Sequence, residues 1–131
     1  MPLIDWRDDF QTGIASLDHE HRAMIGLLNE MAAALPPENA TAQISEFLGE
    51  VYAKIQAHFA LEERIMREHR YAGFAAHKAD HERLLDELRE IMESHQADAG
   101  FDYRGALSKR LADWFMIHFH EFDAKLHELM P

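Results

Sequence analysis

Histidine side chains interrupt the apolar stripes of a chain whose hydrophobic residues otherwise recur with the period of an α-helix. The chain has 131 residues, including ten histidines and no cysteine. Six polar residues lie at positions flanked three or four residues away by apolar side chains, so they face the predicted core: His21, His58, Glu62, His77, His81 and His118. Any fold for this chain must therefore accommodate six polar groups in its interior.

The helical period recurs in four stretches, at about residues 18–35, 41–69, 74–95 and 103–129. Pro36 and Pro37 end the first stretch, because proline cannot continue a helix, and Gly73 separates the second from the third. Four amphipathic helices joined by short loops predict an all-α protein, an antiparallel up-down four-helix bundle.

The segment before the first helix, residues 1–17, is expected to form an N-terminal arm laid across the bundle. Trp6 and Phe10 are its candidate anchors. A chain of this length has room for one domain, so residues 1–131 are predicted to fold as a single unit.

Composition argues against several classes of function. The 24 acidic and 13 basic residues give a net charge of −11, which argues against a nucleic-acid partner and against an anionic membrane surface. No apolar run approaches the roughly 18 residues of a membrane span, and the acidic N-terminus does not resemble a secretory signal. A cytoplasmic protein without membrane insertion is the expectation. The lack of cysteine excludes disulfides, thiolate metal sites and cysteine nucleophiles.

The polar positions on the stripes are expensive to bury. Each unpaired buried polar group costs about 1–3 kcal/mol, so six would cost about 6–18 kcal/mol, comparable with a whole domain stability of about 5–15 kcal/mol. A single histidine on an apolar face is usually a hydrogen-bonded core residue, and a hydrogen-bonded polar layer is one reading of the set. A bound metal is the simpler one, since imidazole and carboxylate are common ligands.

The number of candidate ligands exceeds what one ion needs. A single zinc takes about four ligands, whereas two metal ions sharing carboxylates would use the whole set, and bundle cores hold such pairs. The ferritin-like di-iron pattern requires two Glu-x-x-His pairs, and this sequence contains none.

Asp123 is the candidate for a second carboxylate. It follows His118 by five residues, which on an ideal helix is about 140° around the axis. Two interpretations remain open: a solvated surface carboxylate, or an inward one turned by a local i→i+5 bond, a feature that favours functional sites.

The ordered set of motifs resembles the bacterial hemerythrin family, in its single-domain form. The motifs are Asp18-His19-Glu20-His21, His58-Phe59-x-x-Glu62-Glu63, His77-x-x-x-His81 and Trp114-x-x-x-His118-x-x-x-x-Asp123. The resemblance spans essentially the whole chain and implies a non-haem centre of two iron ions. His77, His81 and His118 would hold one iron. His21 and His58 would hold the other. Glu62, Asp123 and a bridging oxygen would join them, leaving one coordination position open.

The resemblance implies a protein that binds dioxygen reversibly at that position, as a carrier, store or sensor, and is not an enzyme. Phe115, Phe119 and Phe122 are candidates to line an apolar dioxygen pocket. The alternatives are a di-iron oxidase or a peroxide- or nitric-oxide-reducing enzyme on the same ligands, an iron or metal storage or delivery protein, and a metal-free structural bundle. No protein partner is indicated.

Some residues depart from the family pattern or lie outside it. The family often has Tyr-Pro between the second and third helices, where this chain has Tyr71 followed by Ala72, which leaves the shape of that turn in doubt. His69 and His95 are interpreted as edge or surface residues, with a supporting role toward the metal as the alternative. The charged run from Lys78 to Glu93 is interpreted as a solvated helix face.

Overall fold

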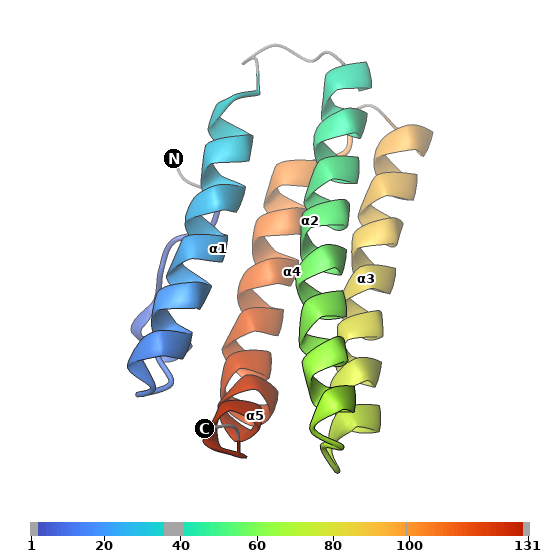
Figure 1. The fold of residues 1–131 in the computed structure, drawn as a ribbon. Coiled ribbons are helices and arrows are strands. Elements are labelled where there is room, and N and C mark those ends of the chain that lie inside the picture. The colour runs from blue at the N-terminus through green and yellow to red at the C-terminus, as the bar shows by residue number, and fades with distance from the viewer. Residues whose placement is uncertain (1–2, 36–40, 99, 130–131) are drawn as a thin grey trace.

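The protein is a bundle of four long helices in the computed structural model, which describes residues 3–35, 41–98 and 100–129. The helices are α1 (Ala15–Ala33), α2 (Thr41–Glu68), α3 (Phe74–Ala97) and α4 (Tyr103–His118). They run alternately up and down (Figure 1), and none of the described residues forms a strand. The prediction of an all-α antiparallel four-helix bundle is confirmed.

The described residues also form three shorter elements. They are the 3₁₀ turn η1 (Asp8–Phe10), the π-helical turn η2 (Phe119–Asp123) and the terminal helix α5 (Ala124–Leu129). The last predicted helix is helical over its whole predicted length, but the π turn η2 interrupts its α-helical hydrogen bonding between α4 and α5. The other predicted helices agree with the structure to within three residues at each end.

Apolar side chains from all four long helices fill the interior. Fully buried examples are Leu28, Ile55, Leu84, Leu107 and Leu111. Each such side chain contributes roughly 1.5–3 kcal/mol of burial free energy, so the bundle is held chiefly by this layer. No helix among the described residues has an apolar stretch of the length that a bilayer crossing requires.

The described part of the segment before α1, residues 3–14, is attached to the bundle at several points. Leu3 and Ile4 are buried, and the Asn29 side chain on α1 both accepts from the Ile4 N–H and donates to the Ile4 carbonyl, each at 2.8 Å. Phe10 is completely buried and packs edge-on against Phe115 of α4, with ring centroids 6.4 Å apart.

The turn between α2 and α3 forms without proline. Arg70 adopts a left-handed φ of 49°, and the Tyr71 N–H donates to the Met66 carbonyl at 2.9 Å, an arrangement common at helix C-termini. A Cβ at Gly73 would lie 2.7 Å from the Tyr71 ring. Glycine therefore allows the tyrosine to fold back over the turn.

The interpretation of His95 as an edge or surface residue is wrong, because its side chain is buried. The cause is the length of α3, which runs to Ala97 and carries His95 against the start of α2. There its Nε2 lies 3.4 Å from the Thr41 carbonyl. His69, by contrast, is exposed, as expected.

The Asp18 carboxylate fixes the entry into α1. One oxygen accepts from the Thr12 N–H and hydroxyl, both at 2.8 Å, and the other accepts from the Gly13 N–H at 3.2 Å. Gly13 has φ of 89°, a conformation that favours glycine. Burial raises the pKa of the Asp18 carboxyl, but the hydrogen bonds from Thr12 and Gly13 outweigh it and lower the pKa below its ordinary value.

We predict that Asp18→Asn lowers the free energy of unfolding at neutral pH by about 1–3 kcal/mol, because the amide cannot accept all three bonds. A lowered native pKa means that the carboxylate's contribution is complete above the unfolded pKa of about 3.9 and is lost as the pH falls through the native pKa. The difference between wild type and variant should therefore shrink below about pH 4. Urea unfolding of the metal-free protein across this range is the measurement. Asp113→Asn, at an exposed position, is the control, and a pH-independent difference would contradict the assignment.

Candidate metal centre

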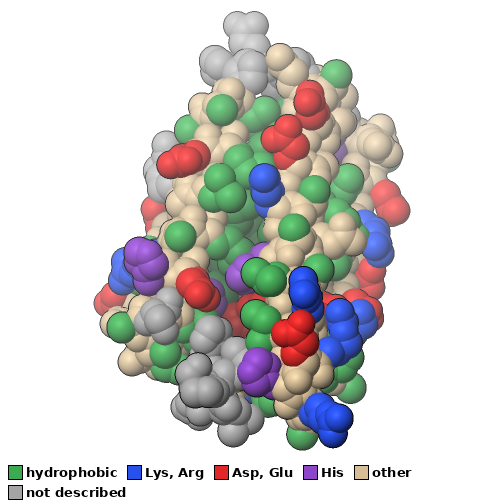
Figure 2. Space-filling view, in the orientation of Figure 1, with side chains coloured by type: hydrophobic (Ala, Val, Ile, Leu, Met, Phe, Trp, Pro, Cys, Tyr) green, Lys and Arg blue, Asp and Glu red, His purple; other side chains and the backbone are tan. Residues whose placement is uncertain are grey.

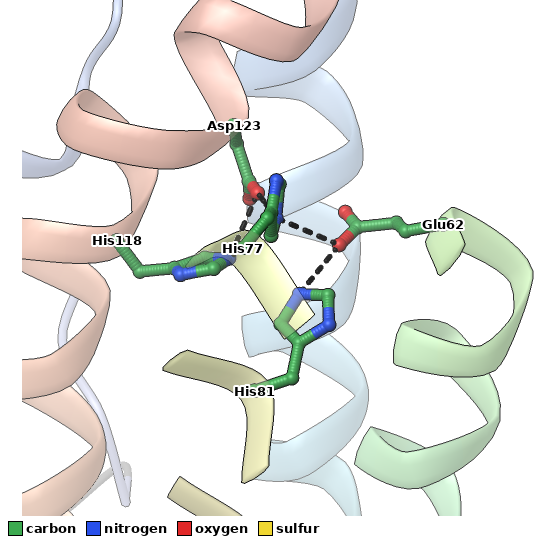
Figure 3. A group of neighbouring side chains, drawn as sticks. All are labelled: Glu62, His77, His81, His118 and Asp123. Atoms are coloured by element: carbon green, nitrogen blue, oxygen red, sulfur yellow. Dashed lines mark hydrogen bonds and ion pairs between the residues drawn. The ribbon is translucent and has the colours of Figure 1, made fainter. Parts of the chain in front are cut away.

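The seven predicted ligand residues meet at one end of the bundle, where α1 begins and α2 ends. Five of them each offer a donor atom within 4.8 Å of all the others (Figure 3), namely Glu62, His77, His81, His118 and Asp123. The remaining two lie against the carboxylates of this group: His21 against Asp123, and His58 against Glu62. The structure thus brings all seven together from four helices and the π turn.

The π turn η2 decides between the two interpretations of Asp123. The Ala124 N–H donates to the Phe119 carbonyl, five residues earlier, which widens the helix by one residue directly after His118. Asp123 consequently faces inward, with a side chain only 2 % exposed, and its Oδ1 lies 2.8 Å from His118 Nε2. The surface interpretation is wrong and the inward one is confirmed.

The two oxygens of Asp123 face different histidines. Oδ1 lies 2.8 Å from His118 Nε2 and 3.0 Å from His77 Nε2, whereas Oδ2 lies 3.0 Å from His21 Nε2. One carboxylate thereby contacts histidines from α1, α3 and α4.

Glu62 is divided in the same way. Its Oε1 lies 3.0 Å from His81 Nε2 and 3.6 Å from His77 Nε2, and its Oε2 lies 3.2 Å from His58 Nε2. Each carboxylate thus presents one oxygen to histidines of α3, joined by His118 of α4 in the case of Asp123, and the other oxygen to a histidine of α1 or α2.

Two further carboxylates orient the rings of His81 and His118 from outside the cluster. His118 Nδ1 donates to Asp80 Oδ2 at 2.7 Å, and His81 Nδ1 donates to Glu63 Oε2 at 2.9 Å. With Nδ1 protonated and bound, each ring directs the lone pair of Nε2 into the cluster. Such outer carboxylates position histidine ligands and raise their basicity.

The role of Asp80 does not follow from the sequence pattern, in which residues 78–93 are interpreted as a solvated helix face. That interpretation is wrong for Asp80, whose side chain is 11 % exposed. The available signal was its position directly before His81 on a helix that packs against α4. Glu63 lies directly beside Glu62 in the second motif, and this position is the same kind of signal.

Both inner carboxylates remain ionised. Burial and the neighbouring Asp123 charge raise the pKa of Glu62, but the close approach of the His58, His77 and His81 rings outweighs them and holds it far below its usual range. Burial also raises the pKa of Asp123, and the close approach of His118, His21 and His77 lowers it well below normal. Burial lowers the pKa of His77, whereas Asp123 and Glu62 raise it, with a net rise to about 9. The interior therefore carries negative charge that attracts protons or a cation.

Several inward atoms have no hydrogen-bond partner despite their close approach. Glu62 Oε1, His81 Nε2 and Asp123 Oδ1 are buried and unsatisfied, and the Nε2 atoms of His77 and His118 lie only 3.1 Å apart. Buried polar atoms without partners are costly. Imidazole nitrogen and carboxylate oxygen are donors for divalent first-row metal ions, so the residues present fit a metal centre.

Of the three phenylalanines predicted to line a dioxygen pocket, two contact predicted ligands. Phe119 stacks on His21 with ring centroids 3.4 Å apart, and the half-buried Phe122 lies 5.2 Å from the His118 ring. Phe115 lies behind Phe119 as seen from His21, and its ring stacks on the Phe119 ring with centroids 4.9 Å apart.

An apolar groove lies between α1 and α2, beside the cluster, and none of the three phenylalanines lines it. It encloses about 450 Å³ and is lined by Glu20, Ala23, Met24, Leu27, Leu28, Lys54, Ile55, His58, Leu61, Glu62, Ile65 and Leu126. Figure 2 shows hydrophobic side chains in the depth between the two helices, with histidine and acidic surfaces near the lower end. The groove therefore reaches His58 and Glu62 from solvent.

A four-helix bundle with a buried cluster of histidines and shared carboxylates at one end defines the class of helical metal-binding bundles. The family model described as "Hemerythrin HHE cation binding domain" matches residues 12–130. Together, the fold, the site and this match show that the chain belongs to the hemerythrin family.

Curated relatives agree with this assignment. A bacteriohemerythrin from Stenotrophomonas maltophilia is 35% identical over 118 residues, covering 90% of this chain and 75% of the relative. A bacteriohemerythrin from Pseudomonas aeruginosa is 31% identical over 126 residues, covering 95% and 79%. A hemerythrin from Siphonosoma cumanense is 28% identical over 127 residues, covering 95% and 90%.

We predict that Asp80→Asn lowers metal affinity by about 10–100-fold, because His118 loses the carboxylate that orients its ring. Competition with a chelator at fixed pH measures the change. Asp86→Asn is the matched control: Asp86 is on the same helix but is exposed and pairs with Arg89. Equal affinities for the two variants would contradict the role of Asp80.

Proposed function

We propose that the chain holds two iron ions and binds dioxygen reversibly at one open coordination position. It would act as a carrier, store or sensor of dioxygen and not as an enzyme. The observation that carries this proposal is the division of each inner carboxylate between two groups of histidines. A carboxylate that serves one ion has no need to present its second oxygen to a separate histidine. Two ferrous ions would supply the two electrons that binding of dioxygen requires.

The ligand sets follow from the same contacts. The histidines around Glu62 Oε1 and Asp123 Oδ1 form the first set: His77, His81 and His118. His21 and His58 face the other two oxygens and form the second set. Two six-coordinate ions would offer about twelve positions, and with Glu62, Asp123 and a bridging oxygen shared between the ions, one position would stay open in the set with two histidines.

The groove between α1 and α2 supports that position as the one for dioxygen. His58 belongs to the two-histidine set and its side chain is 29 % exposed, whereas the other four histidine side chains are at most 1 % exposed. The apolar lining suits a small neutral molecule.

Aromatic packing keeps the rest of the site dry. Phe119 and Phe122 cover the cluster from the side of α4, and Phe115 supports Phe119. Exclusion of water hinders protonation and loss of a bound anion, which favours release of intact dioxygen over turnover. The names of the relatives, bacteriohemerythrin and hemerythrin, support the same assignment.

The decisive experiment is anaerobic loading with ferrous iron, removal of excess iron, and absorption spectra before air, in air and after deoxygenation. We expect two irons per chain and a ligand-to-metal band that appears in air and fades when oxygen is removed. A band that does not reverse, or steady oxygen consumption, would indicate an oxidase. Iron uptake without a band would indicate storage or delivery, and no uptake would overturn the di-iron assignment.

A second prediction concerns entry through the groove. Leu61 lies at its edge with 57 % exposure, so Leu61→Trp should obstruct the mouth without disturbing the core. An added barrier of about 1 kcal/mol slows passage roughly fivefold. Because a barrier acts equally in both directions, association and dissociation of dioxygen should slow by the same factor and affinity should stay constant. Stopped-flow kinetics measure both rates.

The matched control is Ile117→Trp, which places the same ring at an exposed apolar position on α4, outside the lining of the groove. Unchanged rates in Leu61→Trp, or equal slowing in both variants, would argue against the groove as the route.

A further inference from the structure

We propose that the two metal positions fill in order, the three-histidine position first, and that Phe10 of the N-terminal arm sets the affinity of the second position by holding Phe119 against His21. This inference rests on the two-metal centre proposed above. It concerns how that centre assembles, which neither the family match nor the relatives' names address.

Two of the three rings at the three-histidine position are organised before any metal binds, whereas His77 Nδ1 has no hydrogen-bond partner. The rings of His81 and His118 are each held by a charged hydrogen bond, to Glu63 at 2.9 Å and to Asp80 at 2.7 Å. They are also stacked on aromatic rings, with centroids 3.8 Å from Phe59 for His81 and 3.9 Å from Trp114 for His118. Metal binding there requires little ordering of side chains.

The two-histidine position has no such outer hydrogen bonds. His21 Nδ1 is buried and has no partner, so nothing polar fixes the ring from behind. Two contacts orient the ring: Nε2 lies 3.0 Å from Asp123 Oδ2 inside the cluster, and the ring face stacks on Phe119 with centroids 3.4 Å apart and planes 6° from parallel. His58 contacts Glu62, one turn along its own helix, and borders the open groove. This position must lose more side-chain freedom when it binds an ion.

Phe10 connects the N-terminal arm to this weaker position. The buried Phe10 ring packs edge-on against Phe119, with ring centroids 6.0 Å apart. Phe119 in turn is the ring that stacks on His21. The arm is itself held at two points that precede Phe10 in the chain. Asn29 hydrogen-bonds to the Ile4 backbone, and the Arg22 guanidinium lies 4.0 Å from the centroid of the Trp6 ring, which packs against Phe10. Phe10 is thus a positioning residue that acts on His21 through Phe119.

Removing the Phe10 ring would leave a void beside Phe119, and a cavity of this kind is filled only partly by relaxation of its neighbours. Phe119 would then hold His21 less firmly, while Asp80 and Glu63 would still hold the other rings. The second dissociation constant should rise by about tenfold or more, the range typical of lost outer-sphere support, and the first should change little.

The test is an anaerobic titration with ferrous iron followed by native mass spectrometry, which separates chains carrying no, one and two ions. In the wild type, one-ion chains should dominate at one equivalent of iron. In Phe10→Ala they should persist to higher iron, whereas Asp80→Asn should weaken the first step. Phe10→Leu keeps most of the volume, protects the fold, and should show a smaller change in the same direction as Phe10→Ala.

Phe47→Ala is the matched control. Phe47 is also a buried phenylalanine, but it packs against Tyr103 at the other end of the bundle, so the variant removes a core ring without touching the arm. A second readout needs no metal: ¹⁵N spectra of the histidine rings should show a broadened or shifted His21 signal in Phe10→Ala, with the His81 and His118 signals unchanged.

Three results would overturn the inference: two ions binding to the wild type in one step, equal weakening of both steps in Phe10→Ala, or a second step weakened as much in Phe47→Ala. The outcome is separate from that of the proposed function. Ordered filling without a reversible band in air would support the inference and reject reversible dioxygen binding. A reversible band with simultaneous filling of both positions would support dioxygen binding and reject the inference.

Discussion

The contacts of two buried carboxylates hold this site together, and the geometry around them depends on their charge. Glu62 and Asp123 remain ionised in the interior because histidines from four helices surround them. Each carboxylate directs one oxygen to the histidines of the three-histidine set and the other oxygen to a histidine of the two-histidine set. The helices must therefore keep their registers for both oxygens to reach their histidines. A bundle with an apolar layer at this end would be simpler to fold, but it would leave no place for a cation.

The helical period predicted most of this arrangement. It placed the four helices and set five histidines and Glu62 on inward faces, because a residue's face follows directly from its spacing along a helix. Asp123 could not be settled that way, since its orientation depends on a backbone distortion that ordinary periodicity does not encode. The roles of Asp80 and Glu63 do not follow from periodicity for a different reason. They sit at the margins of the stripes, where only the approach of a neighbouring helix decides between solvent and a histidine ring.

The predicted aromatic pocket shows the same division between local and tertiary information. Phe119 and Phe122 are near the cluster because they share a helical segment with His118. The groove beside His58 arises from the spacing between α1 and α2, and no pattern within either helix reports that distance. The two sides of the centre therefore differ in character: one is enclosed by aromatic rings and carboxylates, and the other borders a channel toward solvent.

The π turn has a consequence for how this segment tolerates change in length. It is equivalent to one residue inserted into an otherwise regular helix, and it lets Leu126 reach the core eight residues after His118. Deleting one residue between His118 and Asp123 would allow ordinary α-helical pitch throughout, with histidine and aspartate four apart on one face. Such a deletion would therefore keep the aspartate on the inward face together with the histidine, so the bundle and the position of the carboxylate would both tolerate it. Homologous chains that are one residue shorter in this segment would show whether the centre needs the π turn itself or only an inward carboxylate.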